Sequence, residues 1–194
     1  MKDNNVPDWY IESCQRIKYM FPRAHAVAYV MMSYRIAWFK VYYPVPFYAA
    51  YFTTKVADFN SEVILKGSGA ILARIDEILA KGKNATKKEE DEMTVLEVAY
   101  EMYSRGYEFE PINFGVSDGT KFYEHEGKVL LPFMAVSGIG ETAAKALADE
   151  CRIRPFETIE ELKSRTRISN SNIESLKDMG VLEGMPETDQ LSMF

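Results

Sequence analysis

Apolar side chains dominate the stretch Phe21–Thr53, where they recur with helical spacing. Pro22 is placed where the first turn of a helix tolerates a missing N–H, and the next proline is Pro44. The apolar side of the helix between them is formed by Val27, Val30, Met31, Tyr34, Trp38 and Val41, and the polar side by His25, Tyr29, Ser33 and Lys40. The pattern predicts one long helix, followed by a shorter one at Pro46–Thr53.

This long helix raises the question of a membrane span, which needs ~20 predominantly apolar residues. Polar and cationic side chains recur along it, at Arg23, His25, Ser33, Arg35 and Lys40. They would lie at several depths of a bilayer, so the pattern favours the central helix of a soluble domain with one narrow polar stripe. Two consecutive apolar helices cannot bury their surfaces against each other alone. We expect later helices of this chain, or a surface absent from it, to pack on them.

Three further helices are predicted before residue 107. Two of them, Asp8–Met20 and Ser61–Lys81, are each expected to be capped by their first residue. A Gly-Ser-Gly sequence interrupts the second and indicates a kink or close helix packing rather than a phosphate site. The third begins after Thr86, where Glu89 completes a capping box, and ends at Gly106.

The pattern changes between residues 107 and 133, where short alternating segments are separated by turn residues. The segments are Ile112–Phe114, Lys121–Tyr123 and Val129–Leu131, with a turn at Glu124–Gly127 between the last two. They predict a small β-hairpin element. His125 in this turn is expected to be exposed rather than a metal ligand, because no second His or Cys lies nearby.

The most specific chemical motif is Val136–Gly140, a glycine-hydrophobic-glycine turn that opens a helix of small residues. Glycines let a backbone approach an anion closely, and the following helix presents free N–H groups and its positive dipole end. A dinucleotide site would need a third glycine and a preceding buried strand, and neither is clearly present. A helix-hairpin-helix contact to the phosphate backbone of DNA is the better interpretation, ahead of a purely structural turn. The candidate contacts are Gly138, Ile139, Gly140, Glu141 and Lys145.

A second, degenerate copy of this motif follows. Thr158–Arg165 is predicted to be helical, Ser169 to cap a further helix at Asn170–Met179, and Gly180–Leu182 to close it. We therefore expect a double helix-hairpin-helix in which only the first hairpin is rich in glycine. The chain then leaves the fold at residues 185–186 as an extended tail.

Composition and charge narrow the range of partners. The formal net charge of −6 over 194 residues argues against a broad basic surface, so any nucleic-acid binding must use a small local site. Cys14 and Cys151 match no metal or redox spacing and indicate reduced thiols. The polar first residues do not read as a signal sequence, so we expect a cytoplasmic protein with no membrane partner and no metal site of its own.

Several of these motifs converge on one family. The sequence MFPRAHAVAYV, at residues 20–30, resembles the fingers region of bacterial replicative DNA polymerases, most closely the PolC-type DNA polymerase III alpha subunit. The order of elements is similar too: fingers helices, a β-hairpin followed by LPFMAVSGIG, a double helix-hairpin-helix, and QLSMF at the end. The resemblance covers essentially the whole chain and implies the C-terminal portion of a much larger polymerase.

The resemblance implies a mainly α fold in four parts: a helical fingers segment, a small β-hairpin connector, a double helix-hairpin-helix domain that binds duplex DNA, and a flexible clamp-binding tail, at residues 1–106, 107–133, 134–185 and 186–194. It implies template-directed DNA synthesis by the intact subunit, in which palm carboxylates hold Mg²⁺ for phosphoryl transfer. No palm-type carboxylate cluster occurs in this sequence, so we expect no catalytic residue here and no activity of the chain alone. The implied partners are primer-template duplex, the incoming deoxynucleotide, the sliding clamp and the rest of the polymerase chain.

The resemblance also assigns site residues. Those expected to face the incoming nucleotide or the template are Lys18, Tyr19, Arg23 and His25. Arginine stands at position 23 where the family often has lysine, which replaces a point charge by a planar fork. The alternative for His25 is a core histidine near a helix N-terminus. The tail resembles the sliding-clamp-binding pentapeptide of these polymerases, with methionine in place of the usual leucine, in Gln190, Leu191, Met193 and Phe194.

Two other classes of protein stay open. The chain could be a stand-alone DNA-binding or clamp-binding adaptor that shares a polymerase tail, and a reading frame continuing upstream into palm sequence would exclude this. It could also be a helical interaction module with no DNA role, in which the aromatic helix at Phe21–Thr53 is simply the core. An electrophoretic shift with duplex DNA separates these two.

Overall fold

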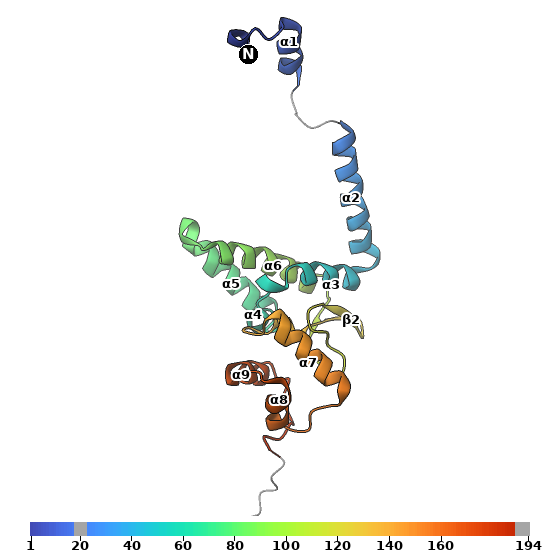
Figure 1. The fold of residues 1–194 in the computed structure, drawn as a ribbon, viewed down its shortest axis with the longest axis vertical. Helices are drawn as coiled ribbons and strands as arrows, with labels where there is room; N and C mark the ends of the chain where they lie inside the picture. The colour runs from blue at the N-terminus through green and yellow to red at the C-terminus, as the bar shows by residue number, and fades with distance from the viewer. Residues whose placement is uncertain (18–22, 189–194) are drawn as a thin grey trace, which may run out of the picture. The chain divides into compact units, whose positions relative to one another are not determined.

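The computed structural model describes residues 1–17 and 23–188 (Figure 1). The chain divides into two compact units, residues 1–42 and 43–194. Helices form most of both units, and a small sheet lies in the second, which confirms the mainly α prediction. Within the part of the chain that is described, no helix is long and apolar enough to cross a membrane.

The first unit contains a 3₁₀ turn and two helices: η1 (Lys2–Asn4), α1 (Asp8–Arg16) and α2 (Arg23–Tyr42). The long helix predicted between two prolines is therefore confirmed. The predicted cap of α1 is wrong, because its N-cap is Pro7 and Asp8 is already its first helical residue.

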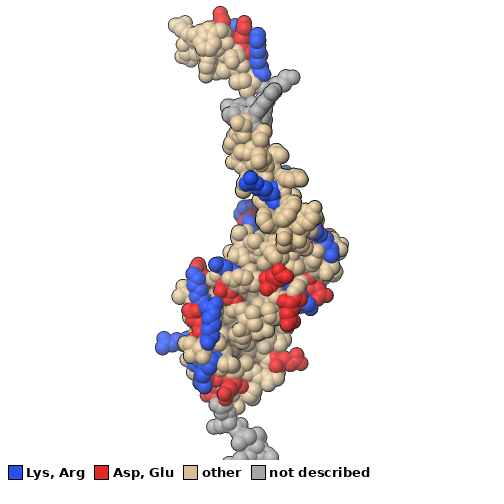
Figure 2. Space-filling model, turned by 90° about the vertical axis from the view of Figure 1, so that its right-hand side faces the viewer, with Lys and Arg blue, Asp and Glu red and all other residues tan. Residues whose placement is uncertain are grey.

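α2 is not a buried helix. Apolar side chains on every side of it are exposed, for example Val30 at 67% and Tyr34 at 74%. The helix carries cations but no acidic residue, and its surface is largely uncharged (Figure 2). The expectation of a central core helix with one polar stripe is thus wrong for this structure. That later helices of this chain, or a surface absent from it, pack on α2 stays a prediction.

The second unit begins with six short or medium helical elements: α3 (Pro44–Thr54), η2 (Val56–Asp58), α4 (Ser61–Ile64), α5 (Ser68–Lys81), η3 (Gly82–Asn84) and α6 (Lys87–Ser104). α5 and α6 lie side by side and are joined by η3 (Figure 1). The capping box before α6 is confirmed: Thr86 Oγ1 accepts from the Glu89 N–H at 3.3 Å, and Glu89 Oε2 accepts from the Thr86 N–H at 2.9 Å.

The helix predicted at Ser61–Lys81 is two helices, and its cap is wrong. Asn60 is the N-cap of α4, because its Oδ1 accepts from the Val63 N–H at 3.2 Å. The break follows Ile64, and Gly67 with φ +92° lets the chain turn into α5. The helix predicted to begin at Pro46 begins two residues earlier, with proline in its first turn.

The sheet has three short strands, β1 (Phe109–Glu110), β2 (Tyr123–His125) and β3 (Lys128–Leu130), in the order β1-β3-β2. β2 and β3 form the predicted antiparallel hairpin, and β1 pairs in parallel with β3. The expected segment Ile112–Phe114 is not a strand, and the strand in this part of the chain is β1, three residues earlier.

His125 is not the freely exposed turn residue that the sequence predicted. It ends β2, and its Nδ1 lies 2.7 Å from Glu110 Oε2 on the first strand. The hydrogen bond to Glu110 raises the pKa of His125. The pair therefore links β1 and β2, the two outer strands of the sheet.

An aromatic cluster joins these elements into one core. Phe52 of α3 is fully buried and its ring centroid lies 5.0 Å from that of Phe109 and 5.9 Å from that of Phe122. The rest of the unit is helical: η4 (Phe133–Ala135), α7 (Glu141–Ile153), α8 (Ile159–Thr166) and α9 (Asn170–Asp178). The core continues into these helices through Leu147 and Leu162, both fully buried.

Candidate functional site

The first hairpin consists of η4, the turn Val136–Gly140 and α7. Its first limb is only a 3₁₀ turn. Gly138 has φ +82°, a left-handed conformation that favours glycine. The Ile139 side chain is 5% exposed and anchors the turn in the core, while Ser137, Gly138 and Gly140 are exposed. The turn is therefore held from within and presents backbone to the outside.

The start of α7 has the features of an anion site. Gly140 is its N-cap and makes no side-chain capping bond, so the first-turn N–H groups lack the cap that α8 and α9 have in Thr158 and Ser169. Gly140 has φ −76°, and a Cβ there would meet nothing within 4 Å. Its own conformation does not require glycine. The absence of a side chain instead leaves room for a close approach from outside.

Not every predicted backbone donor is free. The Ile139 N–H donates to the Val136 carbonyl at 3.1 Å within the turn. Gly140, Glu141 and the rest of the first turn of α7 are then the donors that face outward at this end of the helix. Ile139 serves the site through its buried side chain.

The charged candidates lie one turn apart on α7. Lys145 Nζ is 2.5 Å from Glu141 Oε1, and both side chains are well exposed. This hydrogen bond lowers the pKa of Glu141 and raises that of Lys145. Glu141 therefore partly neutralises the cation that the sequence assigned to the phosphate backbone.

The second hairpin repeats the geometry of the first. Arg167 has φ +56° where the first turn has Gly138, and it is followed by Ile168 and by Ser169, the N-cap of α9. Arg167 is exposed and forms no ion pair with any residue that the structure describes. Sequence reasoning found the two helices but missed this arginine, because nothing local signals a left-handed arginine.

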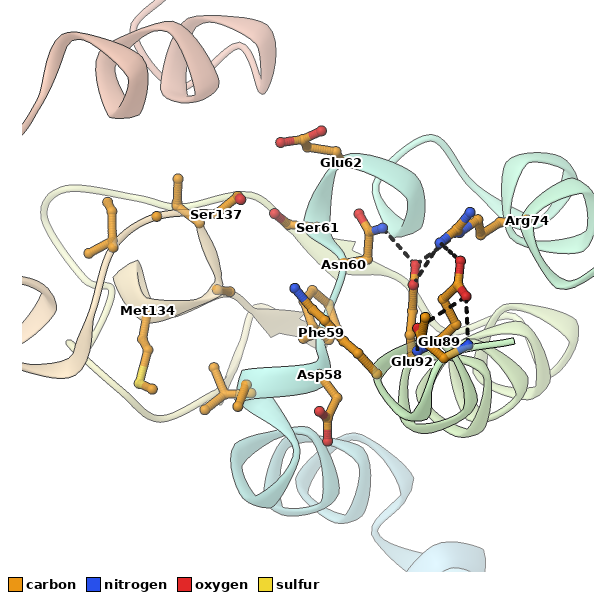
Figure 3. A pocket seen from close by; sticks show the side chains of 18 residues that line it. Asp58, Phe59, Asn60, Ser61, Glu62, Arg74, Glu89, Glu92, Met134 and Ser137 are labelled. Atoms are coloured by element: carbon orange, nitrogen blue, oxygen red, sulfur yellow. Dashed lines mark hydrogen bonds and ion pairs between the residues drawn. The ribbon is translucent and has the colours of Figure 1, made fainter. Parts of the chain in front are cut away.

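A cavity of about 610 Å³ lies behind the first hairpin, between residues 134–139 and the helices α4, α5 and α6 (Figure 3). Glu92 on its wall accepts from Asn60 Nδ2 at 2.7 Å and from Arg74 Nη2 at 3.0 Å. Burial raises the pKa of Glu92, but the bonds from Arg74 and Asn60 outweigh it and leave that pKa below its usual value. The Glu92 carboxylate and the Arg74 guanidinium thus neutralise each other at this wall. Across the described ranges, His, Cys, Asp and Glu form no group of three that could hold a metal ion.

The other predicted site residues lie in the first unit or outside the described residues. Lys18 and Tyr19 lie outside the described residues, and Arg23 is the first residue of α2. His25 is exposed on α2 with its ring 4.5 Å from that of Tyr29, which does not fit a core histidine. Also outside the described residues are Gln190, Leu191, Met193 and Phe194.

Comparison with known proteins agrees with this geometry. A family model described as the helix-hairpin-helix motif matches residues 106–191. The chain is 53% identical to the PolC-type DNA polymerase III of Caldanaerobacter subterraneus subsp. tengcongensis and 45% identical to that of Bacillus subtilis, each over 194 residues. The enzyme of Clostridium perfringens is 48% identical over 195 residues. These matches cover 100% of this chain but only 13–14% of each relative.

Proposed function

Because the chain is homologous throughout to a segment of PolC-type DNA polymerase III, we propose that it holds the duplex behind the site of DNA synthesis in such a polymerase. The duplex backbone is bound without regard to sequence by the first hairpin, at the start of α7. The observation that carries this proposal is the exposed start of α7, which no side chain caps.

The chemistry of the site suits a phosphate diester. Backbone N–H groups at a helix start bind phosphate oxygens and carry no base information, so one site serves every sequence. The net charge of −6 limits the number of phosphates that the chain can engage. Lys145 can add a cation if it turns from Glu141 toward the backbone of the duplex, and Arg167 supplies one at the second hairpin.

Titration of a labelled duplex with the 194-residue chain at several salt concentrations tests this function. We expect weak binding whose log affinity falls with log salt by a slope of roughly −2 to −4. Lys145→Ala should make this slope shallower by about 0.9, the share of one phosphate contact. Lys83→Ala, an exposed lysine in η3, is the matched control and should leave the slope unchanged. Binding that is insensitive to salt, or absent, would refute the proposal.

We further propose that the first unit is the fingers part of the longer polymerase. Lys18, Tyr19, Arg23 and His25 would then face the incoming deoxynucleotide or the template. The exposed apolar side chains of α2 support this, because a helix of that kind needs a packing surface from elsewhere. The palm carboxylates and their Mg²⁺ would belong to the rest of that polymerase, with no catalytic residue in this chain.

Kinetics of the longer polymerase test the fingers proposal. We expect His25→Ala to raise the KM for deoxynucleotide, or to lower kcat, several-fold more than its effect on unfolding free energy would explain. His125→Ala is the matched control, because it removes the bond to Glu110 and should change stability rather than KM. Equal losses of stability and activity in His25→Ala would contradict the proposal.

The tail completes the proposed function. Gln190, Leu191, Met193 and Phe194 would bind the bacterial sliding clamp and keep the polymerase on its template. A short segment of this kind loses ordering entropy on binding but gains two or three apolar anchors in a preformed groove.

A further inference from the structure

The two hairpins are joined by one buried side chain, Asn172. It lies on the first turn of α9 and is 7% exposed. Its Nδ2 donates to the Ser137 carbonyl of the first hairpin at 3.0 Å, across 35 positions of sequence. Its Oδ1 accepts from the Ser169 hydroxyl of the second hairpin at 2.6 Å. One amide thus contacts both turns.

The chemistry of these contacts fixes the orientation of the amide. A backbone carbonyl can only accept, so the group facing Ser137 O must be the NH₂ of Asn172. The opposite end then accepts from Ser169, whose Oγ also accepts from the Asn172 N–H at 3.2 Å and caps α9. The Asn172 side chain thus uses its NH₂ group toward one hairpin and its oxygen toward the other.

Gly138 has no side chain, and this leaves room for the Asn172 amide behind the turn. A Cβ on Gly138 would lie 2.9 Å from Asn172 Nδ2, closer than real Cβ contacts. The first glycine of the motif is therefore required by its φ and by the amide behind it. This requirement is separate from the open space in front of Gly140.

We propose that Asn172 is a positioning residue that locks the two hairpins into one arrangement, so that both turns bind the backbone of one duplex at the same time. The inference rests on the proposed duplex binding. Two contacts held at a fixed separation bind as one bivalent site, because the second meets its phosphate at a high effective concentration. Without the link, each turn would bind its phosphate more nearly alone.

Hydrogen exchange of the free 194-residue chain tests the lock without DNA. In Asn172→Ala, amides of residues 136–142 should exchange about 5-fold faster, as expected for the loss of one buried hydrogen bond. Asn172→Asp keeps the acceptor for Ser169 but cannot donate to Ser137, and should match the alanine variant. Asn60→Ala is the control, because it removes a comparable amide link, to Glu92, and should leave this segment unchanged. Parent-like exchange in Asn172→Ala or Asn172→Asp would overturn the lock.

Duplex titration tests the consequence. Asn172→Ala should weaken binding about tenfold and make the salt slope shallower by about 0.9, whereas Asn60→Ala should change neither. If the parent chain binds no duplex, the proposed function is wrong, and so is the proposal that both turns bind one duplex. If the parent binds and Asn172→Ala binds equally well with the same slope, only the present inference is overturned.

Discussion

Replacing Gly140 with leucine is expected to weaken duplex binding about 10- to 100-fold while the fold stays intact. Leucine fits the backbone there, because φ is −76° and a Cβ would contact nothing within 4 Å. The added side chain would stand in front of the first-turn N–H groups of α7 and keep a phosphate away. Hydrogen bonds to a charged group are worth about 1.5–3 kcal/mol, which gives the expected loss. Fluorescence anisotropy with a labelled duplex measures it.

A second glycine supplies the control for this experiment. Gly69 lies in the first turn of α5, outside both hairpins, and a Cβ there also meets nothing within 4 Å. Gly69→Leu should therefore bind duplex like the parent. Gly138 is unsuitable for the comparison, since φ +82° and the nearby Asn172 amide would make its replacement disturb the turn itself. Equal affinities of the Gly140→Leu and Gly69→Leu variants would remove the start of α7 from the interface.

The tail carries the second large effect. A peptide of the last ten residues is expected to bind the bacterial sliding clamp with micromolar affinity, or about −8 kcal/mol. Leu191→Ala combined with Phe194→Ala should weaken binding about 100-fold or more, because each buried apolar anchor contributes about 1.5–3 kcal/mol. Met193→Leu should tighten binding a few-fold, since leucine has less flexibility to lose. Calorimetry of the peptides against the purified clamp gives these values.

Ser192→Ala serves as the control peptide, because a small polar side chain between the anchors should contribute little. We expect it to stay within a few-fold of the parent. Should the doubly substituted peptide bind as well as the parent, the tail is not a clamp ligand.

Local signals in the sequence predicted the helices well. The capping box of Thr86 and Glu89 lies within four residues, so its geometry follows from the sequence alone. The choice between two neighbouring capping residues does not follow from the sequence alone. Asn60 rather than Ser61 caps α4, because the Asn60 amide also reaches Glu92 on α6. That contact depends on the packing of α4 against α6. Helical spacing likewise predicted α2 but not the exposure of its apolar side chains, because spacing does not show what packs on a helix.

For the candidate site too, local features could be predicted from the sequence and long-range contacts could not. The glycines of the first hairpin are local features, and the sequence pointed to the right turn and to an anion at the start of α7. Asn172 and Arg167 were missed for physical reasons. The Asn172 bond to Ser137 spans 35 positions, and no periodicity encodes it. A left-handed arginine is costly in isolation, so the conformation of Arg167 follows from the close of α8 and the cap of α9 around it.

Hydrogen exchange of the 194-residue chain, measured with and without a short duplex, locates the DNA contact on the chain. We expect slowed exchange at residues 138–145 and 167–172 when duplex is added, with no change in the turn between α5 and α6. The protection should disappear as salt is raised, in step with the loss of binding. Bound duplex that leaves residues 138–145 unprotected would contradict the claim that the hairpin at Gly140 holds the DNA backbone.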